Sequence, residues 1–134
     1  MSDRTILLVD EPTRMRDLLT SILRMRGYAV IEVDNGRDVM KRIRNIRPDL
    51  LILEAMLPIQ SGFEICAMLK RDPEFRHLPT LMMCSSAHRP PGETVLGKDY
   101  LLSDEFLVRP FGLQELLARI EKLIGAVPSL ESSP

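Results

Sequence analysis

The sequence predicts an α/β fold of three layers, in which a doubly wound parallel sheet is covered by helices on both faces. Five short apolar runs alternate along the 134 residues with segments that are predicted to be helical, the fourth of which has only a poor helical pattern, and this order is typical of parallel α/β proteins. The apolar runs are mostly continuous rather than alternating, as expected for strands that are buried on both faces. The length allows one domain with a single core.

Five apolar runs are predicted to be strands. They are rich in Val, Ile, Leu and Met, and they occupy residues 5–9, 28–33, 50–53, 80–84 and 106–108. Aromatic residues make up only 4% of the chain, whereas methionine occurs eight times. The core must therefore be built from aliphatic and methionine side chains.

Helical periodicity follows four of these runs. The segments with apolar residues three and four apart are 14–28, 35–48, 61–73 and 112–125. In the first segment, one broad apolar face is predicted from Met15, Leu18, Leu19, Ile22, Leu23 and Met25. Gly27 ends that helix, and Pro48 lies beyond the end of the second. Residues 85–103 contain Pro90-Pro91-Gly92 and have a poor apolar pattern, so we expect a loop there with one short helix.

Composition excludes several classes of function. The formal net charge is −1, which gives no indication of nucleic-acid or anionic-membrane binding. The two cysteines, Cys66 and Cys84, lie in apolar stretches without metal-ligand spacing, so buried thiols in a reducing cytoplasm are expected. No signal peptide and no membrane-spanning segment is recognisable. We expect one domain at 1–125 and a flexible tail or truncated linker at 126–134.

Polar residues stand at the carboxyl ends of the predicted strands, where α/β sheets place their sites. Asp10 and Glu11 follow the first strand, Glu54 follows the third, Cys84 ends the fourth and Arg109 follows the fifth. Three carboxylates and one guanidinium should therefore converge. Because negative charge is then in excess, either a divalent ion binds or one carboxyl group has a raised pKa.

Four stretches resemble the receiver domains of bacterial response regulators. They are VDEPTRMRDLL (9–19), PDLLILEAMLPIQSGFEI (48–65), LPTLMMCS (78–85) and DEFLVRPFGLQEL (104–116). The resemblance covers roughly residues 4 to 124. It implies a flavodoxin-like sheet of order 2-1-3-4-5, a phosphoryl group accepted by an Asp of the third strand, and assistance from Mg²⁺ and an acidic pair.

The resemblance also assigns roles to individual residues. Asp10 and Glu11 match the acidic pair, Glu54 matches the phosphoacceptor Asp, and Cys84 matches the switch Thr or Ser. Phe106 matches the aromatic switch position, and Arg109 matches the phosphate-contacting Lys, before a Pro110 whose peptide bond is expected to be cis. Glu11, Glu54, Cys84 and Arg109 thus depart from the usual residue types.

These departures predict an atypical receiver, or pseudo-receiver. Glu54 is one methylene longer than Asp, and phosphoryl transfer depends on positioning. The planar fork of Arg109 fits a carboxylate with two hydrogen bonds, so we predict a Glu54–Arg109 pair in place of a phosphorylated Asp. Cys84 replaces a hydroxyl donor with a weakly donating thiol. The predicted function is signalling by protein docking, without enzymatic activity.

Alternative functions remain open at the level of sequence. One is a phosphoaccepting regulator with Mg²⁺ at Asp10, Glu11 and Glu54, and a remote one is a small Mg²⁺-dependent phosphotransferase or hydrolase. The expected docking face comprises the region 85–103, the strand at 106–108 and the last helix, with homodimer formation as an option. The basic run 41–47 is either a solvated face or a patch for an acidic partner. A P-loop-like stretch at 92–99 lacks the strand and hydroxyl that such a loop requires.

Overall fold

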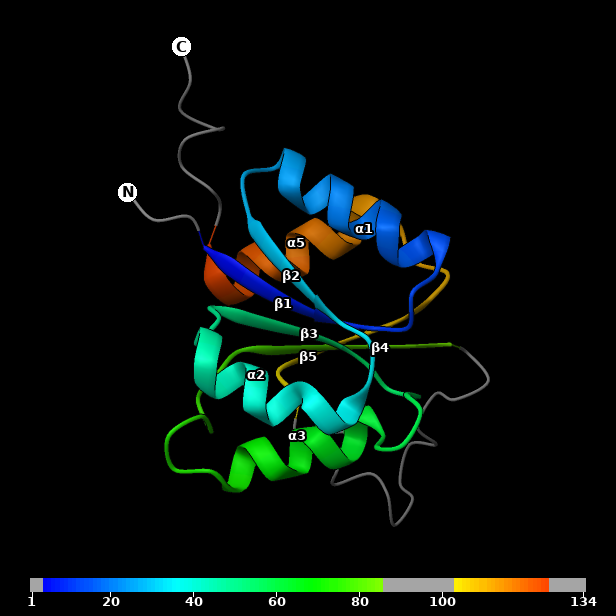
Figure 1. Cartoon of the computed structure of the whole chain (residues 1–134). Coiled ribbons are helices and arrows are strands. Elements are labelled where there is room, and N and C mark those ends of the chain that lie inside the picture. The colour runs from blue at the N-terminus through cyan, green and yellow to red at the C-terminus, as the bar shows by residue number, and fades with distance from the viewer. Residues whose placement is uncertain (1–3, 86–102, 126–134) are drawn as a thin grey trace.

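The protein forms a five-stranded parallel sheet of order β2-β1-β3-β4-β5 (Figure 1). The computed structural model describes residues 4–85 and 103–125. The strands are β1 (Thr5–Val9), β2 (Ala29–Val33), β3 (Leu50–Glu54), β4 (Thr80–Ser85) and β5 (Glu105–Arg109). This topology confirms both the predicted fold class and the strand order implied by the resemblance.

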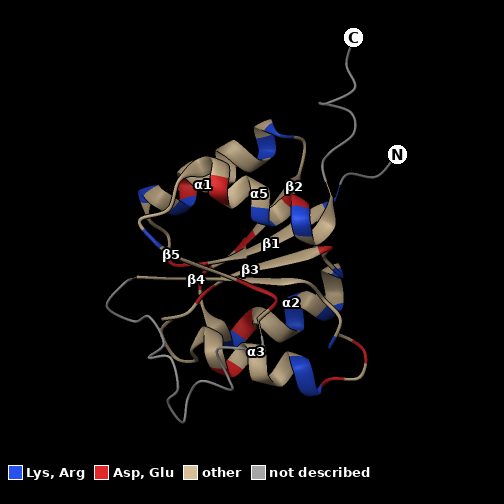
Figure 2. Ribbon diagram, turned by 180° about the vertical axis from the view of Figure 1, so that it is seen from behind, with Lys and Arg blue, Asp and Glu red and all other residues tan. Residues whose placement is uncertain are grey.

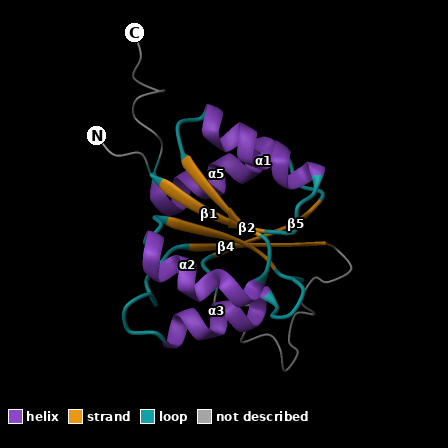
Figure 3. Ribbon diagram, in the orientation of Figure 1, coloured by secondary structure: helices purple, strands orange, loops and turns teal. Residues whose placement is uncertain are grey.

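Helices cover both faces of this sheet (Figure 3). Their bounds are α1 (Arg14–Met25), α2 (Val39–Ile46), α3 (Gly62–Arg71) and α5 (Leu113–Ile124). Helices α1 and α5 lie on one face, and α2 and α3 lie on the other. Each face has its own apolar cluster, because successive residues of a strand point to opposite sides. All five residues of β3 are buried, as expected for the central strand.

Local sequence explains where two of these helices begin. The Thr13 side chain accepts a hydrogen bond of 3.2 Å from the backbone N–H of Arg16 and thereby caps α1. Ser61 and Glu64 form a reciprocal capping box at the start of α3. After α1, Gly27 adopts a φ of 98°, a conformation that glycine accepts without steric cost. The predicted stop at Gly27 is confirmed.

The structure corrects the prediction for the second helical segment. Residues 36–38 form a 3₁₀ turn, η1 (Gly36–Asp38), and α2 begins only at Val39. A Cβ atom on Gly36 would lie 2.2 Å from the Gln60 carbonyl oxygen. Close packing of this turn against the loop before α3 therefore requires glycine at position 36.

The first helix differs from the prediction in what it buries. Met15, Leu18 and Met25 were predicted to share the apolar face, but 48%, 53% and 79% of their respective surfaces are exposed. The face that contacts the sheet is narrower and includes Leu19 and Leu23. An apolar stripe wider than the area that the sheet can cover leaves its edge in solvent.

Two predicted regions lie outside the described residues. They are most of the expected loop and short helix at 85–103, including the stretch 92–99, and the tail at 126–134. In the part of the chain that the structure describes, no helix is long and apolar enough to cross a membrane.

Candidate functional site

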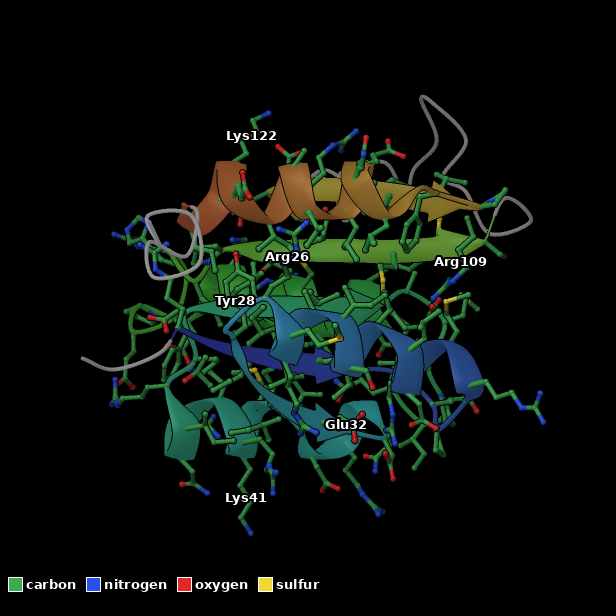
Figure 4. All side chains as sticks on the ribbon, turned by 90° about the horizontal axis from the view of Figure 1, so that it is seen from above. Arg26, Tyr28, Glu32, Lys41, Arg109 and Lys122 are labelled. Atoms are coloured by element: carbon green, nitrogen blue, oxygen red, sulfur yellow. The ribbon has the colours of Figure 1, made fainter. Side chains whose placement is uncertain are left out.

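The charges of Asp10, Glu54 and Arg109 meet at the carboxyl ends of β1, β3 and β5. Figure 4 shows Arg109 at one end of the sheet, with Lys122 on α5 towards the other end. Arg109 is the last residue of β5, Glu54 is the last residue of β3, and Asp10 directly follows β1. Nη2 of Arg109 donates a short hydrogen bond to Oε1 of Glu54 and lies 3.6 Å from Oδ2 of Asp10. The predicted Glu54–Arg109 pair is confirmed.

The geometry of this pair differs from the predicted fork. A single guanidinium nitrogen, Nη2, contacts both Glu54 and Asp10, rather than two nitrogens binding one carboxylate. The reason is that two carboxylates from different strands compete for one cation. Arg109 therefore bridges β1 and β3 from β5. The peptide bond between Arg109 and Pro110 is cis, as the resemblance implied.

The backbone around Glu54 is tightly packed. The Gly62 N–H donates to the Ala55 carbonyl over 2.8 Å, and a Cβ atom on Gly62 would lie 2.3 Å from the Glu54 carbonyl oxygen. The Met56 N–H donates to Oε2 of Glu54 over 3.3 Å. One oxygen of the Glu54 carboxylate is thus held by Arg109 and the other by the backbone.

Burial has the largest effect on the pKa of Asp10, one of the two buried acids of the site, Asp10 and Glu54, which we call the acid pair. Asp10 and Glu54 are each 7% exposed, and burial raises the pKa of Asp10 above its usual value of 3.8. A hydrogen bond of 2.8 Å from the Glu11 N–H opposes this shift in the pKa of Asp10, the charge of Glu54 adds to it, and Arg109 offsets part of it. Of the two alternatives left by the sequence, a carboxyl group with a raised pKa agrees with this site.

The magnesium site that the phosphoaccepting alternative places at Asp10, Glu11 and Glu54 does not match this arrangement. Among residues 4–85 and 103–125, no group of three or more His, Cys, Asp or Glu side chains is placed to hold a metal ion. The Glu11 side chain is exposed, and the cation of Arg109 already contacts the other two acids. As arranged, these residues do not fit a Mg²⁺ ion, which requires near-octahedral oxygen ligands.

The two switch positions lie in the apolar core of the α2–α3 face. Cys84 is fully buried and forms no disulfide bond, and its register partner on β5 is Val108. Phe106 pairs in register with Met82 and packs, partly buried, against the same cluster as Cys84. Position 84 is therefore enclosed in apolar surroundings at the end of β4.

Sequence reasoning missed a second buried cation beside the acid pair. Arg16 is 8% exposed. It forms a short ion pair with Asp34, donates to the Asp10 carbonyl over 3.2 Å, and lies 3.5 Å from Glu32. A signal was present, because residues 16, 19, 20 and 23 all lie on the buried face of α1. A charged residue on such a face requires a partner.

A surface hollow and the basic run lie outside the acid site. The hollow has a volume of about 460 Å³ and is lined by Glu32, Val33, Asp34, Asn35, Asp38, Lys41, Arg42 and Asn45. Figure 2 shows the distribution of charged residues over the ribbon, including the basic residues of α2. Arg47, the last cation of the run, pairs with Glu74 and lies over the Phe75 ring, with 5.5 Å to the ring centroid.

The fold and the site together define the chain as a flavodoxin-like α/β domain with an acidic site at the strand ends. The model of the "Response regulator receiver domain" family matches residues 6–121. The chain belongs to this family of CheY-like receiver domains, which are signalling modules.

Individual relatives agree with this assignment. The transcriptional regulatory protein GltR of Pseudomonas aeruginosa is 34% identical over 121 residues, which are 90% of this chain and 49% of GltR. The phosphate regulon transcriptional regulatory protein PhoB of the same organism is 31% identical over 124 residues, 92% of this chain and 53% of PhoB. The chain thus spans about half the length of these relatives.

Solved structures give the same fold. A putative response regulator from Chloroflexus aurantiacus has a TM-score of 0.80 and 27% identity, with 92% of this chain and 98% of that chain covered. The chemotaxis response regulator CheY4 of Vibrio cholerae has a TM-score of 0.78 and 22% identity, with 91% and 99% covered.

Proposed function

We propose that this receiver domain signals by docking a protein partner and does not accept a phosphoryl group. The observation that carries the proposal is the ion pair between Glu54 and Arg109. It fixes a carboxylate and a cation at the positions that match the phosphoacceptor and the phosphate-contacting residue of the family. The site then holds a permanent carboxylate, paired with a cation, where other receivers gain a transient phosphoryl group.

The geometry of Glu54 disfavours phosphoryl transfer in two ways. Its longer side chain moves the acceptor oxygen by about 1 Å relative to Asp, and a displacement of this size can reduce a rate by about 10²-fold. Its oxygens are also occupied by Arg109 and by the Met56 N–H. A phosphoryl donor would have to break the pair before an oxygen could attack.

The identity of residue 84 supports the same conclusion. Cys84 is fully buried and has a thiol, a weak donor, where the family has a hydroxyl that reads the phosphate. Without a hydroxyl donor at position 84, a phosphoryl group would have no strong hydrogen bond through which to change the position of Phe106. The orientation of the β5 side chains would then be independent of phosphorylation.

The docking face that we propose comprises β5, α5 and the region before β5. Residues 86–102 of that region lie outside the described part of the chain. In the described part, Arg119 and Lys122 of α5 both pair with Glu105 of β5. These ion pairs join the helix to the strand and give the face a defined shape, which suits recognition of a protein partner or of a second copy.

The test compares the chain with a variant that restores the family residues at three positions, E54D/C84T/R109K. Backbone amide NMR spectra are recorded with and without Mg²⁺ and beryllofluoride, a phosphoryl mimic. We expect the signals of β5 and α5 to shift in the restored variant and to remain unchanged in the native chain. Equal shifts in both proteins would contradict the proposal.

A further inference from the structure

Arg16 connects the loop of the acid site to the edge strand of the sheet. Its Nη1 donates to the carbonyl oxygen of Asp10 over 3.2 Å and pairs with Oδ1 of Asp34, which directly follows β2. Its Nε lies 3.5 Å from Oε2 of Glu32, and the Thr20 hydroxyl donates to the same oxygen over 2.6 Å. One buried guanidinium thus joins β1, α1 and β2 at a single point.

The loop between β1 and α1, residues 10–13, which we call the Asp10 loop, makes few other contacts with its neighbours. The Asp10 N–H donates to the Val33 carbonyl over 3.1 Å, and the Glu11 N–H donates back to the Asp10 carboxylate. Residues 11–13 are exposed. The hydrogen bond from Arg16 to the Asp10 carbonyl therefore attaches this loop directly to a buried side chain.

The position of Asp10 matters because its carboxylate also faces Arg109. The Asp10 carbonyl contacts Arg16, and the Asp10 Oδ2 lies 3.6 Å from Nη2 of Arg109. The two arginines therefore hold the same residue from its backbone and from its side chain. A shift of the loop would change the distance between Asp10 and the Glu54–Arg109 pair.

We propose that Arg16 is a positioning residue, which fixes the Asp10 loop against β2 and so sets the geometry of the acid pair around Arg109. The role rests on the proposed function only in that it concerns the same pocket. Its readouts involve neither phosphoryl uptake nor a partner, so the two proposals can fail separately. The neighbouring acids, Glu32 and Asp34, also line the hollow beside β2, which leaves these partners of Arg16 in contact with solvent.

The chain offers a matched control in Arg119. Its Nη1 also bonds one carboxylate and one strand carbonyl, Glu105 over 3.0 Å and Phe106 over 3.1 Å. Arg119 belongs to α5 and makes no contact with the acid pair that the structure describes. Loss of Arg119 therefore removes a similar set of contacts without touching the Asp10 loop.

The experiment measures amide hydrogen exchange and the side-chain Nε–H NMR signal of Arg109 in R16Q, R16K and R119Q. The amides are those of Asp10 and Glu11, and the reference is the Ala55 amide, which donates to Met83 over 2.8 Å. In R16Q, exchange at Asp10 and Glu11 should rise about tenfold relative to Ala55, since local opening is separable from global unfolding. The Arg109 signal should move in the same variant.

The other variants separate positioning from general support of the fold. R119Q should leave both the exchange ratio and the Arg109 signal as in the native chain, and R16K should restore part of the protection. If R16Q fails to fold, D34N removes the exposed partner of Arg16, and the same local increase is expected there. An unchanged ratio in R16Q or in D34N, or an equal change in R119Q, would overturn the proposal.

Discussion

The ion pair between Glu54 and Arg109 makes a quantitative prediction through a double-mutant cycle of E54Q and R109Q. Glu54 is 7% exposed, and 27% of the Arg109 side chain is exposed. Removing one partner of a buried pair typically costs about 3–5 kcal/mol, because the other charge stays buried. R109Q leaves Glu54 and Asp10 together without a cation, and the partial exposure of the site reduces the expected cost to about 2–3 kcal/mol.

Substitution of the other partner, E54Q, should lower the free energy of unfolding by less than R109Q does. In E54Q, Arg109 keeps Asp10 at 3.6 Å and keeps access to solvent, so a loss of about 1 kcal/mol is expected. In the double variant neither residue carries a charge, and the cost should fall below the sum of the single costs. The coupling free energy between Glu54 and Arg109 should be about 1–2 kcal/mol.

Urea unfolding of the four proteins at pH 7 measures this coupling. Arg47 and Glu74 provide the matched control, since they form the same type of pair with exposed side chains, 64% and 49%. Exposed pairs contribute about 0.2–1 kcal/mol, so the control coupling should lie at the low end. A coupling free energy between Glu54 and Arg109 no larger than that of the control pair would refute the claim that this ion pair holds Glu54 in place.

Three further predictions concern the surroundings of the site. The folded chain raises the pKa of Asp10 above 3.8, so the ionisation of Asp10 lowers the stability of the fold as the pH rises from 3.8 through the raised pKa. D10N should therefore raise the melting temperature at pH 7, and this gain should disappear below pH 3.8. The hydrogen bond from Lys122 lowers the pKa of Glu105 below 4.5, so E105Q should destabilise the chain at neutral pH, and the difference in melting temperature should vanish as pH falls below that lowered pKa. G62A should cost about 1–3 kcal/mol in urea unfolding because of the contact with the β3 carbonyl, whereas G112A, whose Cβ meets nothing within 4 Å, should cost less. Differences in melting temperature that do not change with pH for D10N and E105Q would contradict the first two predictions. Equal losses of stability in G62A and G112A would contradict the third.

The sequence predicted the fold because its signals are local and repeated. Most strands are built on a continuous apolar run, and the helices α1 and α3 have a stop or start signal, Gly27 and Ser61 respectively. The start of α2 was missed because a 3₁₀ turn and an α-helix have similar apolar spacing over one turn. The requirement for Gly36 depends on a carbonyl 24 residues away at Gln60, which no local pattern contains.

The site was predicted in part for a similar reason. Position at a strand end identified Asp10, Glu54 and Arg109, since parallel strands bring these positions together. Which nitrogen of Arg109 binds, and that Asp10 shares it, depends on side-chain packing. The network of Arg16 was missed because its partners, Glu32 on β2 and Asp34 directly after β2, lie 16 and 18 residues further along the chain.

Phosphoryl uptake by the native chain decides whether Glu54 is a fixed anion or a phosphoryl acceptor. Intact mass spectrometry tests it most directly, after incubation with acetyl phosphate and Mg²⁺, with E54D measured in parallel. We expect the native chain to keep its mass. A gain by E54D alone would identify the extra methylene of Glu54 as the block to transfer. If the native chain gains the mass of one phosphoryl group and E54Q does not, Glu54 is the acceptor, which would contradict the proposed function and make this domain a phosphorylated switch.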